Sequence, residues 1–197
     1  MSPGSAVTRG QILRPDLEEI EHVRRHARCL VTAADVDAAI SRMAGELTTR
    51  LHASDPVVYC VMNGGLIFAG QLIPRLDFPL EVAYLHATRY GRALSGAEID
   101  WRVRPTTEFN GRAVLVVDDV LDEGHTLAAI VDHLARSGAR EVLTAVLVDK
   151  QHHRKARPGM RADFTGLDVE DRYLFGCGLD YKGYWRNLPA IYALGDD

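Results

Sequence analysis

The sequence has few cysteines, and their pattern argues against a disulfide-stabilised scaffold. Only three occur in 197 residues, at Cys29, Cys60 and Cys177. An odd number at wide spacing is typical of reduced thiols in a cytosolic protein. The chain also lacks a basic start followed by an apolar run and a small-residue cleavage site. We therefore expect no secretory signal and a cytoplasmic location.

Long hydrophobic runs and a strong charge of one sign are absent as well. The best apolar stretch, Val57 to Ala69, is interrupted by Asn63, Gly64 and Gly65 and is shorter than the roughly 18 residues of a membrane span. With 23 basic and 27 acidic residues, the chain is not a strongly basic nucleic-acid protein. The composition, 47% hydrophobic and 25% charged, excludes disordered, collagen-like and coiled-coil chains.

At this length we expect a single domain, residues 1–197, of the α/β class. A helix is predicted from about Ala33 to Leu51, because apolar residues recur every three or four positions after the capping residue Thr32. A weaker helix is expected from Glu18 to Arg28. The apolar, largely β-branched run from Val57 to Met62 predicts a strand that is covered on both faces, as in a parallel sheet.

The later segments continue the alternation of predicted helices and strands. A strand is predicted from Leu80 to Leu85, followed by a long loop from His86 to Asp100 that has no steady period. Strands at Ala113 to Val117 and Glu141 to Val148 flank a helix and complete a strand-helix-strand unit. The stretch from Phe164 to Leu194 is rich in glycine and tyrosine, so we expect short strands there that form a hood beside the sheet.

The segment from Val114 to Thr126 joins a buried strand to a helix through an acidic glycine turn. In open α/β sheets, ligands lie beyond the carboxyl ends of the strands, and such a turn presents backbone N–H groups to a phosphate. Gly124 allows close approach, and Thr126 adds a hydroxyl donor. The carboxylates in this turn would repel a phosphate unless a cation intervened, and oxygen ligands with phosphates favour Mg²⁺. Any single aspartate here suggests only a helix cap, but the whole string indicates a site.

This string resembles the motif that binds 5-phosphoribosyl pyrophosphate (PRPP) in type I phosphoribosyltransferases. From about Val57 onward the chain is similar to their 6-oxopurine branch, the hypoxanthine-guanine phosphoribosyltransferases. The resemblance implies a parallel sheet core flanked by helices, with a hood formed by about residues 164–197 and N-terminal residues. It also implies purine salvage: Mg²⁺-dependent transfer of the phosphoribosyl group from PRPP to N9 of hypoxanthine or guanine, giving IMP or GMP and pyrophosphate. We expect small-molecule substrates, no membrane or nucleic-acid partner, and a homodimer or homotetramer.

The resemblance assigns roles to the acidic residues. Asp118 and Asp119 match the pair that binds the ribose hydroxyls, and together with Asp180 they are the expected metal ligands. Asp122 matches the carboxylate beside purine N7 and is the candidate general base. The turn from Asp122 to Thr126 would bind the 5′-phosphate, mainly through backbone amides. The residues of this turn are Asp122, Glu123, Gly124, His125 and Thr126. Glu123 departs from the small Thr or Ser that is usual in the family.

The segment Val61 to Gly65 resembles the pyrophosphate loop, in which the residue before the first glycine belongs to a cis peptide. Asn63 and Gly64 are therefore expected to bind pyrophosphate, although Asn63 replaces a commoner lysine. Arg186 matches the arginine that contacts the same group. The resemblance implies that the loss of a lysine weakens attraction for pyrophosphate without removing the backbone amide.

The remaining matches concern the purine and the loop that closes over it. Lys150 matches the lysine that donates to the purine O6. Tyr173 matches the aromatic ring that stacks on the base, and the carbonyl of Leu174 would read its edge. Arg89 and Tyr90 match the start of the mobile loop, where Arg89 is a departure from the serine found more often.

Two other functions remain open from the sequence. Some proteins of this fold are nucleotide-sensing regulators that bind RNA or DNA, and the basic stretch from His152 to Arg161 supports that possibility. We interpret this stretch as a solvated turn. A receiver-like signalling domain would also place acids and a lysine at strand ends, but it would leave Gly124, His125, Thr126 and the hood unexplained.

Overall fold

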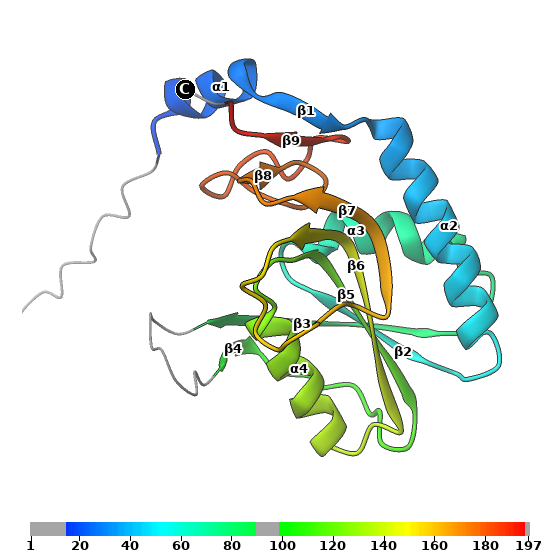
Figure 1. Cartoon of the computed structure of the whole chain (residues 1–197). Helices are drawn as coiled ribbons and strands as arrows, with labels where there is room; N and C mark the ends of the chain where they lie inside the picture. The colour runs from blue at the N-terminus through cyan, green and yellow to red at the C-terminus, as the bar shows by residue number, and fades with distance from the viewer. Residues whose placement is uncertain (1–14, 90–98, 196–197) are drawn as a thin grey trace, which may run out of the picture.

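A computed structural model describes residues 15–89 and 99–195, and it contains two β-sheets (Figure 1). The larger sheet has six strands in the order β4-β3-β2-β5-β6-β7, all parallel to their neighbours except β4, which runs antiparallel to β3. Its strands are β2 (Val57–Val61), β3 (Glu81–Arg89), β4 (Ile99–Val103), β5 (Ala113–Leu121), β6 (Glu141–Gln151) and β7 (Phe164–Glu170). The expected α/β fold with a mostly parallel sheet is confirmed.

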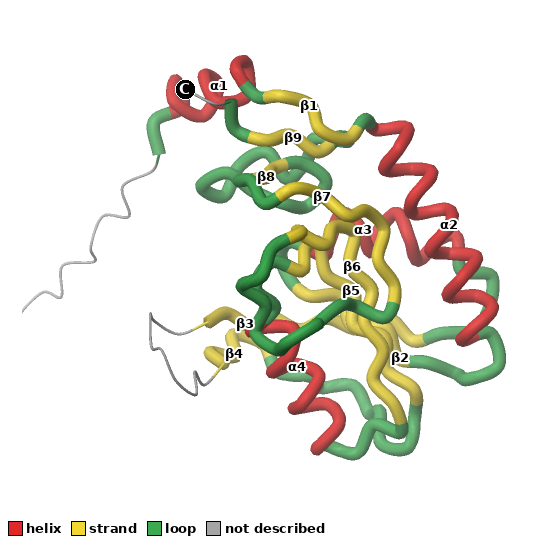
Figure 2. Tube along the Cα trace, in the orientation of Figure 1, coloured by secondary structure: helices red, strands yellow, loops and turns green. Residues whose placement is uncertain are grey.

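Helices cover both faces of this sheet (Figures 1 and 2). α2 (Ala33–Leu51) and α3 (Gly65–Leu72), which continues into the short 3₁₀ helix η1 (Ile73–Arg75), pack on one face, and α4 (His125–Arg136) packs on the other. α2 has the predicted bounds, and the Thr32 hydroxyl oxygen accepts the Asp35 N–H at 3.2 Å as its cap. This bond satisfies one of the amides that a helix leaves unpaired at its N-terminus.

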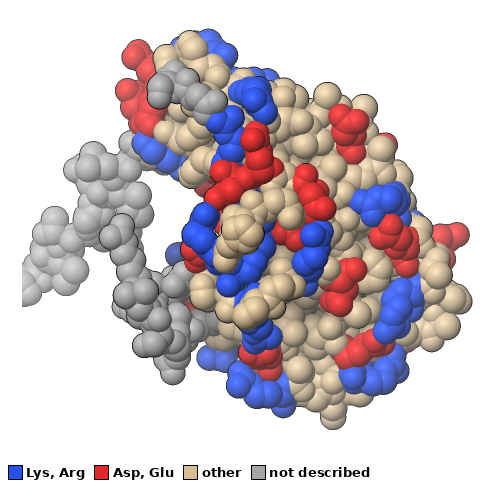
Figure 3. Space-filling model, viewed as in Figure 1, with Lys and Arg blue, Asp and Glu red and all other residues tan. Residues whose placement is uncertain are grey.

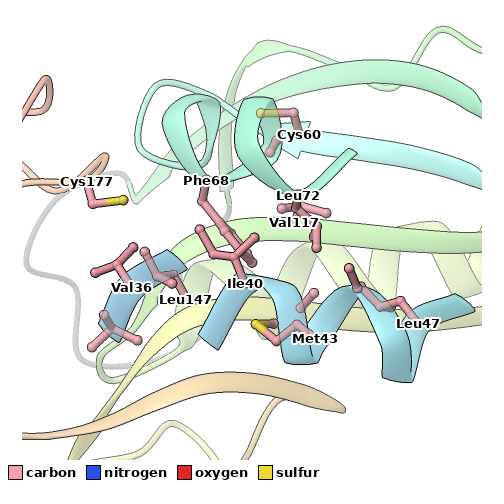
Figure 4. Close-up of a cluster of buried hydrophobic side chains, with 14 of the residues drawn as sticks. Val36, Ile40, Met43, Leu47, Cys60, Phe68, Leu72, Val117, Leu147 and Cys177 are labelled. Atoms are coloured by element: carbon pink, nitrogen blue, oxygen red, sulfur yellow. The ribbon is translucent and has the colours of Figure 1, made fainter. Parts of the chain in front are cut away.

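The two helical layers divide the core. Successive side chains of a strand point to opposite faces, so alternate residues of β2 and β5 enter different clusters. Val58, Cys60 and Val117 pack beneath α2 and α3. Figure 4 shows Cys60 and Val117 in this cluster. Val57 and Val116 pack beneath α4 on the other face. Burying one such aliphatic side chain is worth about 1.5–3 kcal/mol, so both faces stabilise the sheet edge that carries the site.

The smaller sheet joins distant parts of the chain. Its order is β1-β9-β8, with antiparallel pairs, and its strands are β1 (Arg28–Val31), β8 (Leu174–Phe175) and β9 (Ile191–Ala193). β7 lies in the larger sheet, so the separate sheet begins later than the expected boundary near residue 164. Helix α1 (Leu17–His26) is tied to this part because the Trp185 indole N–H donates to the Ile20 carbonyl at 2.8 Å.

Three of the predicted boundaries were wrong. Arg28 belongs to β1 and not to the preceding helix, because it pairs with Ala193 at the far end of the chain. The segment expected to be one loop from His86 to Asp100 begins and ends as strand, since β3 continues to Arg89 and pairs with β4. β5 continues four residues beyond Val117, so Asp118 and Asp119 lie within the strand.

The three cysteines are free thiols, as the sequence predicts. Burial raises the pKa of Cys60 to about 12 and that of Cys177 to about 11, whereas Cys29 is exposed. None of the helices within the described ranges is long and apolar enough to cross a bilayer.

Candidate functional site

The candidate site lies where the strand order of the larger sheet reverses. β3 and β5 are on opposite sides of β2, so the loops after β2 and β5 diverge and leave a crevice between them. A cleft of about 670 Å³ opens there. The residues predicted from the sequence that line it are Asn63, Gly64, Asp118, Asp119, Asp122, Glu123, Gly124, His125, Thr126, Asp180 and Arg186.

A smaller cavity of about 160 Å³ adjoins this cleft. It is lined by the three residues expected to bind the purine, Lys150, Tyr173 and Leu174. Asp119 and Asp180 line both hollows and so connect them. Tyr90 and the side chain of Arg89 lie outside the described residues, and their role in a mobile loop remains a prediction.

The loop after β2 lies directly on the acidic end of β5. The Met62–Asn63 peptide bond is cis, which is the feature implied by the family resemblance. A Cβ at Gly64 would lie 2.2 Å from the Asp119 carboxylate oxygen Oδ2, so only glycine allows this approach. Gly178, in the hood, lies against the same loop. A Cβ at Gly178 would lie 2.3 Å from the Gly64 carbonyl oxygen, and its φ of +104° also favours glycine.

Asp118 and Asp119 form a crowded acidic pair beneath that loop. Asp119 is 8% exposed, and its N–H donates to the Asp118 carboxylate at 3.0 Å. Burial raises the pKa of both carboxyls, and the charge of Asp119 raises the pKa of Asp118 further. A bound cation or hydroxyl donors would favour the ionised forms of this pair.

The turn from β5 into α4 leaves backbone amides facing the cleft. Gly124 has a φ of +85°, and a Cβ there would lie 2.7 Å from Leu121 and 2.8 Å from Met160. The N-cap residue of α4 is Gly124, which has no side chain to cap the first amides of the helix, at His125 and Thr126, so an anion can take that place. The Glu123 carboxylate lies 3.5 Å from Nε2 of the His125 imidazole.

Asp122, at the mouth of the cleft, has a hydrogen-bond donor on each carboxylate oxygen. Oδ2 accepts from Lys150 Nζ at 2.8 Å, and Oδ1 lies 2.8 Å from His152 Nε2. Burial alone would raise the pKa of Asp122, but these hydrogen bonds outweigh it and lower the pKa below its usual value. Asp122 is therefore ionised near neutral pH and can accept a proton.

Arg186 connects the hood to the acidic pair. Its guanidinium lies 2.5 Å from the Asp180 carboxylate, donates to the Gly178 carbonyl at 2.6 Å, and approaches Asp119 Oδ2 to 4.0 Å. The Tyr173 ring is half exposed at the smaller cavity, and its hydroxyl donates to the Asp180 carbonyl at 3.2 Å. A cation and an aromatic face thus border the space above Asp119.

Sequence reasoning missed several polar residues at the site. Arg102 on β4 and Arg154 line the larger cleft. The basic stretch after β6 is more than a solvated turn, because the side chains of His152 and Lys155 are only 5% and 12% exposed. Both reach inward to the turn after β5. In the sequence, the only sign of these residues is the basic stretch itself, and its composition does not reveal which side chains point toward the site.

Asp122, His152 and Asp171 place ligand atoms within 4.8 Å of one another, an arrangement that a metal ion could use. Asp171 is already paired with the Arg154 guanidinium, at 2.7 and 3.2 Å, and Asp122 is paired with Lys150. These cations already neutralise the carboxylates of Asp122 and Asp171.

Comparison with known proteins agrees with this arrangement. Residues 32–178 match the family model of the phosphoribosyl transferase domain. The chain is 31% identical over 168 residues to a hypoxanthine-guanine phosphoribosyltransferase of Bacillus subtilis, covering 85% of this chain and 92% of that protein. It is 32% identical over 177 residues to a hypoxanthine-guanine-xanthine phosphoribosyltransferase of Tritrichomonas foetus, covering 90% and 93%.

Solved structures show the same similarity. A hypoxanthine phosphoribosyltransferase of Staphylococcus aureus superposes with a TM-score of 0.81 and 25% identity, covering 91% of this chain and 96% of that one. A hypoxanthine-guanine-xanthine phosphoribosyltransferase structure gives a TM-score of 0.72 with 32% identity, covering 86% and 94%. The chain belongs to the phosphoribosyltransferase family, in its hypoxanthine-guanine branch.

Proposed function

We propose that this chain transfers the 5-phosphoribosyl group of PRPP to N9 of hypoxanthine or guanine, in purine salvage, with Mg²⁺ as cofactor and IMP or GMP and pyrophosphate as products. The observation that carries the proposal is the pairing of Lys150 with Asp122, 2.8 Å apart, between the two cavities.

The pair is complementary to one edge of a 6-oxopurine. Lys150 offers a donor to the exocyclic O6, and Asp122 beside it offers an acceptor to the N7–H. A 6-amino group would instead present a donor to the ammonium of Lys150. The half-exposed Tyr173 ring provides the surface on which the base stacks, with Leu174 beside it.

The larger cleft suits PRPP. The amides at the start of α4, together with the Thr126 hydroxyl, would hold the 5′-phosphate, and Asp118 and Asp119 would hold the ribose hydroxyls. The backbone of Asn63 and Gly64 would bind pyrophosphate opposite Arg186. These assignments are supported by the cleft that all of these residues line.

Asp118, Asp119 and Asp180 are the proposed Mg²⁺ ligands. All three are hard oxygen donors. The raised pKa of Asp118 and Asp119 supports the assignment, because a bound cation would stabilise their ionised carboxylates. When bound, Mg²⁺ neutralises charge on the pyrophosphate.

The reaction breaks the bond from C1′ to the pyrophosphate oxygen and forms the bond from C1′ to purine N9. Negative charge develops on the leaving group, where Arg186 stabilises it. The N7 proton of the purine passes to Asp122, whose lowered pKa keeps it ionised beforehand. Closure by the segment that begins at Arg89 and Tyr90 would exclude water.

The proposal extends to assembly and location. Val82 and Tyr84 are more than half exposed on the face of β3 beside α3, and a second copy in a homodimer or homotetramer would cover them. A cytoplasmic location agrees with the three free thiols. On the face drawn in Figure 3, basic and acidic side chains are interleaved, so this face offers no continuous basic patch for the nucleic acid of the regulator alternative.

Pyrophosphate release from PRPP, measured with and without Mg²⁺, tests the proposal. Hypoxanthine and guanine should support release, adenine should be poor, and chelation should abolish activity. Xanthine is measured alongside, because an extra oxo group leaves the O6 and N7 edge unchanged. Comparable turnover of adenine would contradict the proposed role of Lys150. RNA binding without turnover of any purine would favour the regulator.

A further inference from the structure

His152 belongs to none of the motifs that define the proposed activity, yet it contacts the candidate base. We infer that His152 is a positioning residue, which holds Oδ1 of Asp122 so that Oδ2 accepts the purine proton. The inference rests on the proposed function, because it concerns the proton transfer in that reaction.

The hydrogen bonds around the imidazole define its tautomer. Nδ1 accepts the backbone N–H of Arg154 at 3.0 Å, so this nitrogen carries no proton. In the neutral ring the proton must then be on Nε2, which lies 2.8 Å from Asp122 Oδ1. The side chain is 5% exposed, so little water competes for either bond. His152 is thereby oriented as a donor to Asp122.

The two oxygens of Asp122 consequently have different roles. A proton placed on Oδ1 would face the Nε2–H of His152 and remove its acceptor. Oδ2 faces Lys150, whose ammonium can turn to the purine O6 when the base is bound. Oδ2 is then available to the N7 proton, while Oδ1 remains bonded to His152.

The main chain of Asp122 is held by the same loop. Lys155 Nζ donates to the carbonyls of Leu121 and Asp122, each at 2.8 Å, and to the buried carboxylate of Asp149 at 2.7 Å. The loop after β6 therefore fixes the position of Asp122 through both backbone and side chain. With the main chain anchored, the orientation of the carboxylate depends on Lys150 and His152.

Several charged groups surround the imidazole. The charged groups near it are the carboxylates of Asp122 and Asp171, the ammonium of Lys150 and the guanidinium of Arg154. Each carboxylate is paired with one of these cations. Protonation of Nδ1 would break the bond from the Arg154 N–H. The bond from the Arg154 N–H therefore orients the ring with Nε2 toward Asp122.

Two substitutions separate the contacts of His152. In His152→Asn the shorter side chain can still accept the N–H two residues on, as asparagine does in an Asx-turn, but it does not reach Asp122. In His152→Gln the side-chain amide reaches Asp122 and supplies a neutral donor. His153→Ala is the matched control, because the neighbouring histidine is exposed and no hydrogen bond of its side chain is found in the described structure.

We expect His152→Asn to lower kcat with hypoxanthine by about 10- to 100-fold, as for loss of a charge-assisted hydrogen bond, with little change in KM for PRPP. The acid limb of its kcat profile should move to higher pH, because the Asp122 carboxylate loses a stabilising donor. His152→Gln should recover most of kcat and the acid limb, and His153→Ala should match the parent enzyme. Melting temperatures of the full chain report on folding.

An unchanged kcat and acid limb in His152→Asn would overturn the inference. It would also be overturned if His152→Gln were as impaired as His152→Asn, since the loop and not the donor would then be responsible. If the parent enzyme released no pyrophosphate with any purine, the proposed function itself would fail. The parent measurement therefore distinguishes the two failures.

Discussion

Replacing Gly64 by alanine should impair PRPP use without unfolding the protein. The backbone of Gly64 has φ −59° and ψ −51°, which alanine adopts without strain. The new methyl group would lie 2.2 Å from Asp119 Oδ2, about 1.2 Å inside the 3.4 Å at which ordinary contact begins. The obstacle is a side chain, so the Asp119 carboxylate must rotate away from its position in the cleft.

A displacement of about 1 Å at a substrate-positioning group can cost about 10²-fold in rate. We therefore expect kcat/KM for PRPP to fall about 100-fold in Gly64→Ala. Relieving the overlap should cost about 1–2 kcal/mol of stability, or about 2–8 °C in melting temperature.

Gly70→Ala is the matched control within the adjoining helix. A Cβ at Gly70 meets no atom within 4 Å, so this variant should keep full activity and gain up to about 1 kcal/mol of stability. Steady-state kinetics in PRPP and thermal unfolding of both variants provide the measurement. Unimpaired kcat/KM in Gly64→Ala would refute the close approach of the loop to Asp119.

Three further predictions concern the base, the leaving group and the thiols. Asp122→Asn should retain PRPP binding, measured by calorimetry, while kcat falls by about 10²- to 10⁴-fold, and full turnover at every pH would exclude Asp122 as the base. Arg186→Ala should raise the pyrophosphate inhibition constant more than Asn63→Ala, because it removes a cation rather than a neutral amide, and the opposite ranking would contradict the assignment. In the native protein a thiol reagent should label Cys29 alone at first, because burial raises the pKa of the other two thiols to about 11 and about 12; rapid labelling of all three would show that the core opens.

Local sequence patterns predicted the helices and strands whose apolar residues recur at regular spacing along the chain. The apolar stripe and cap of α2 gave both of its ends, and the β-branched run of β2 indicated a strand buried on both faces. β1 escaped prediction because its partner, β9, is more than 150 residues away in the chain. β4 was missed for a similar reason, since its strand character comes from pairing with β3.

The site residues also divide into those that a local sequence pattern reveals and those whose role depends on contacts distant in sequence. The glycine turn after β5 is continuous in sequence, so Asp122 and Gly124 could be singled out from the string alone. His152 could not, because its role depends on an imidazole that turns inward from a loop while His153, beside it, stays exposed. The buried position of Lys155 was hidden in the same way, within a stretch whose composition resembles a solvated turn.

The pairing of β1 with β9 has a consequence for the order in which the protein is made. Residues 28–31 leave the ribosome early, but their partners at 191–193 follow only after the whole larger sheet has been synthesised. The nascent chain can therefore form the larger sheet, with the acidic turn after β5, before the hood that supplies Asp180 and Arg186 to the cleft is complete. A chain that stops short of residue 191 would leave β1 and β8 without the strand that joins them. Such a truncated protein should retain the larger sheet, lose the hood, and expose an apolar surface that chaperones and proteases recognise.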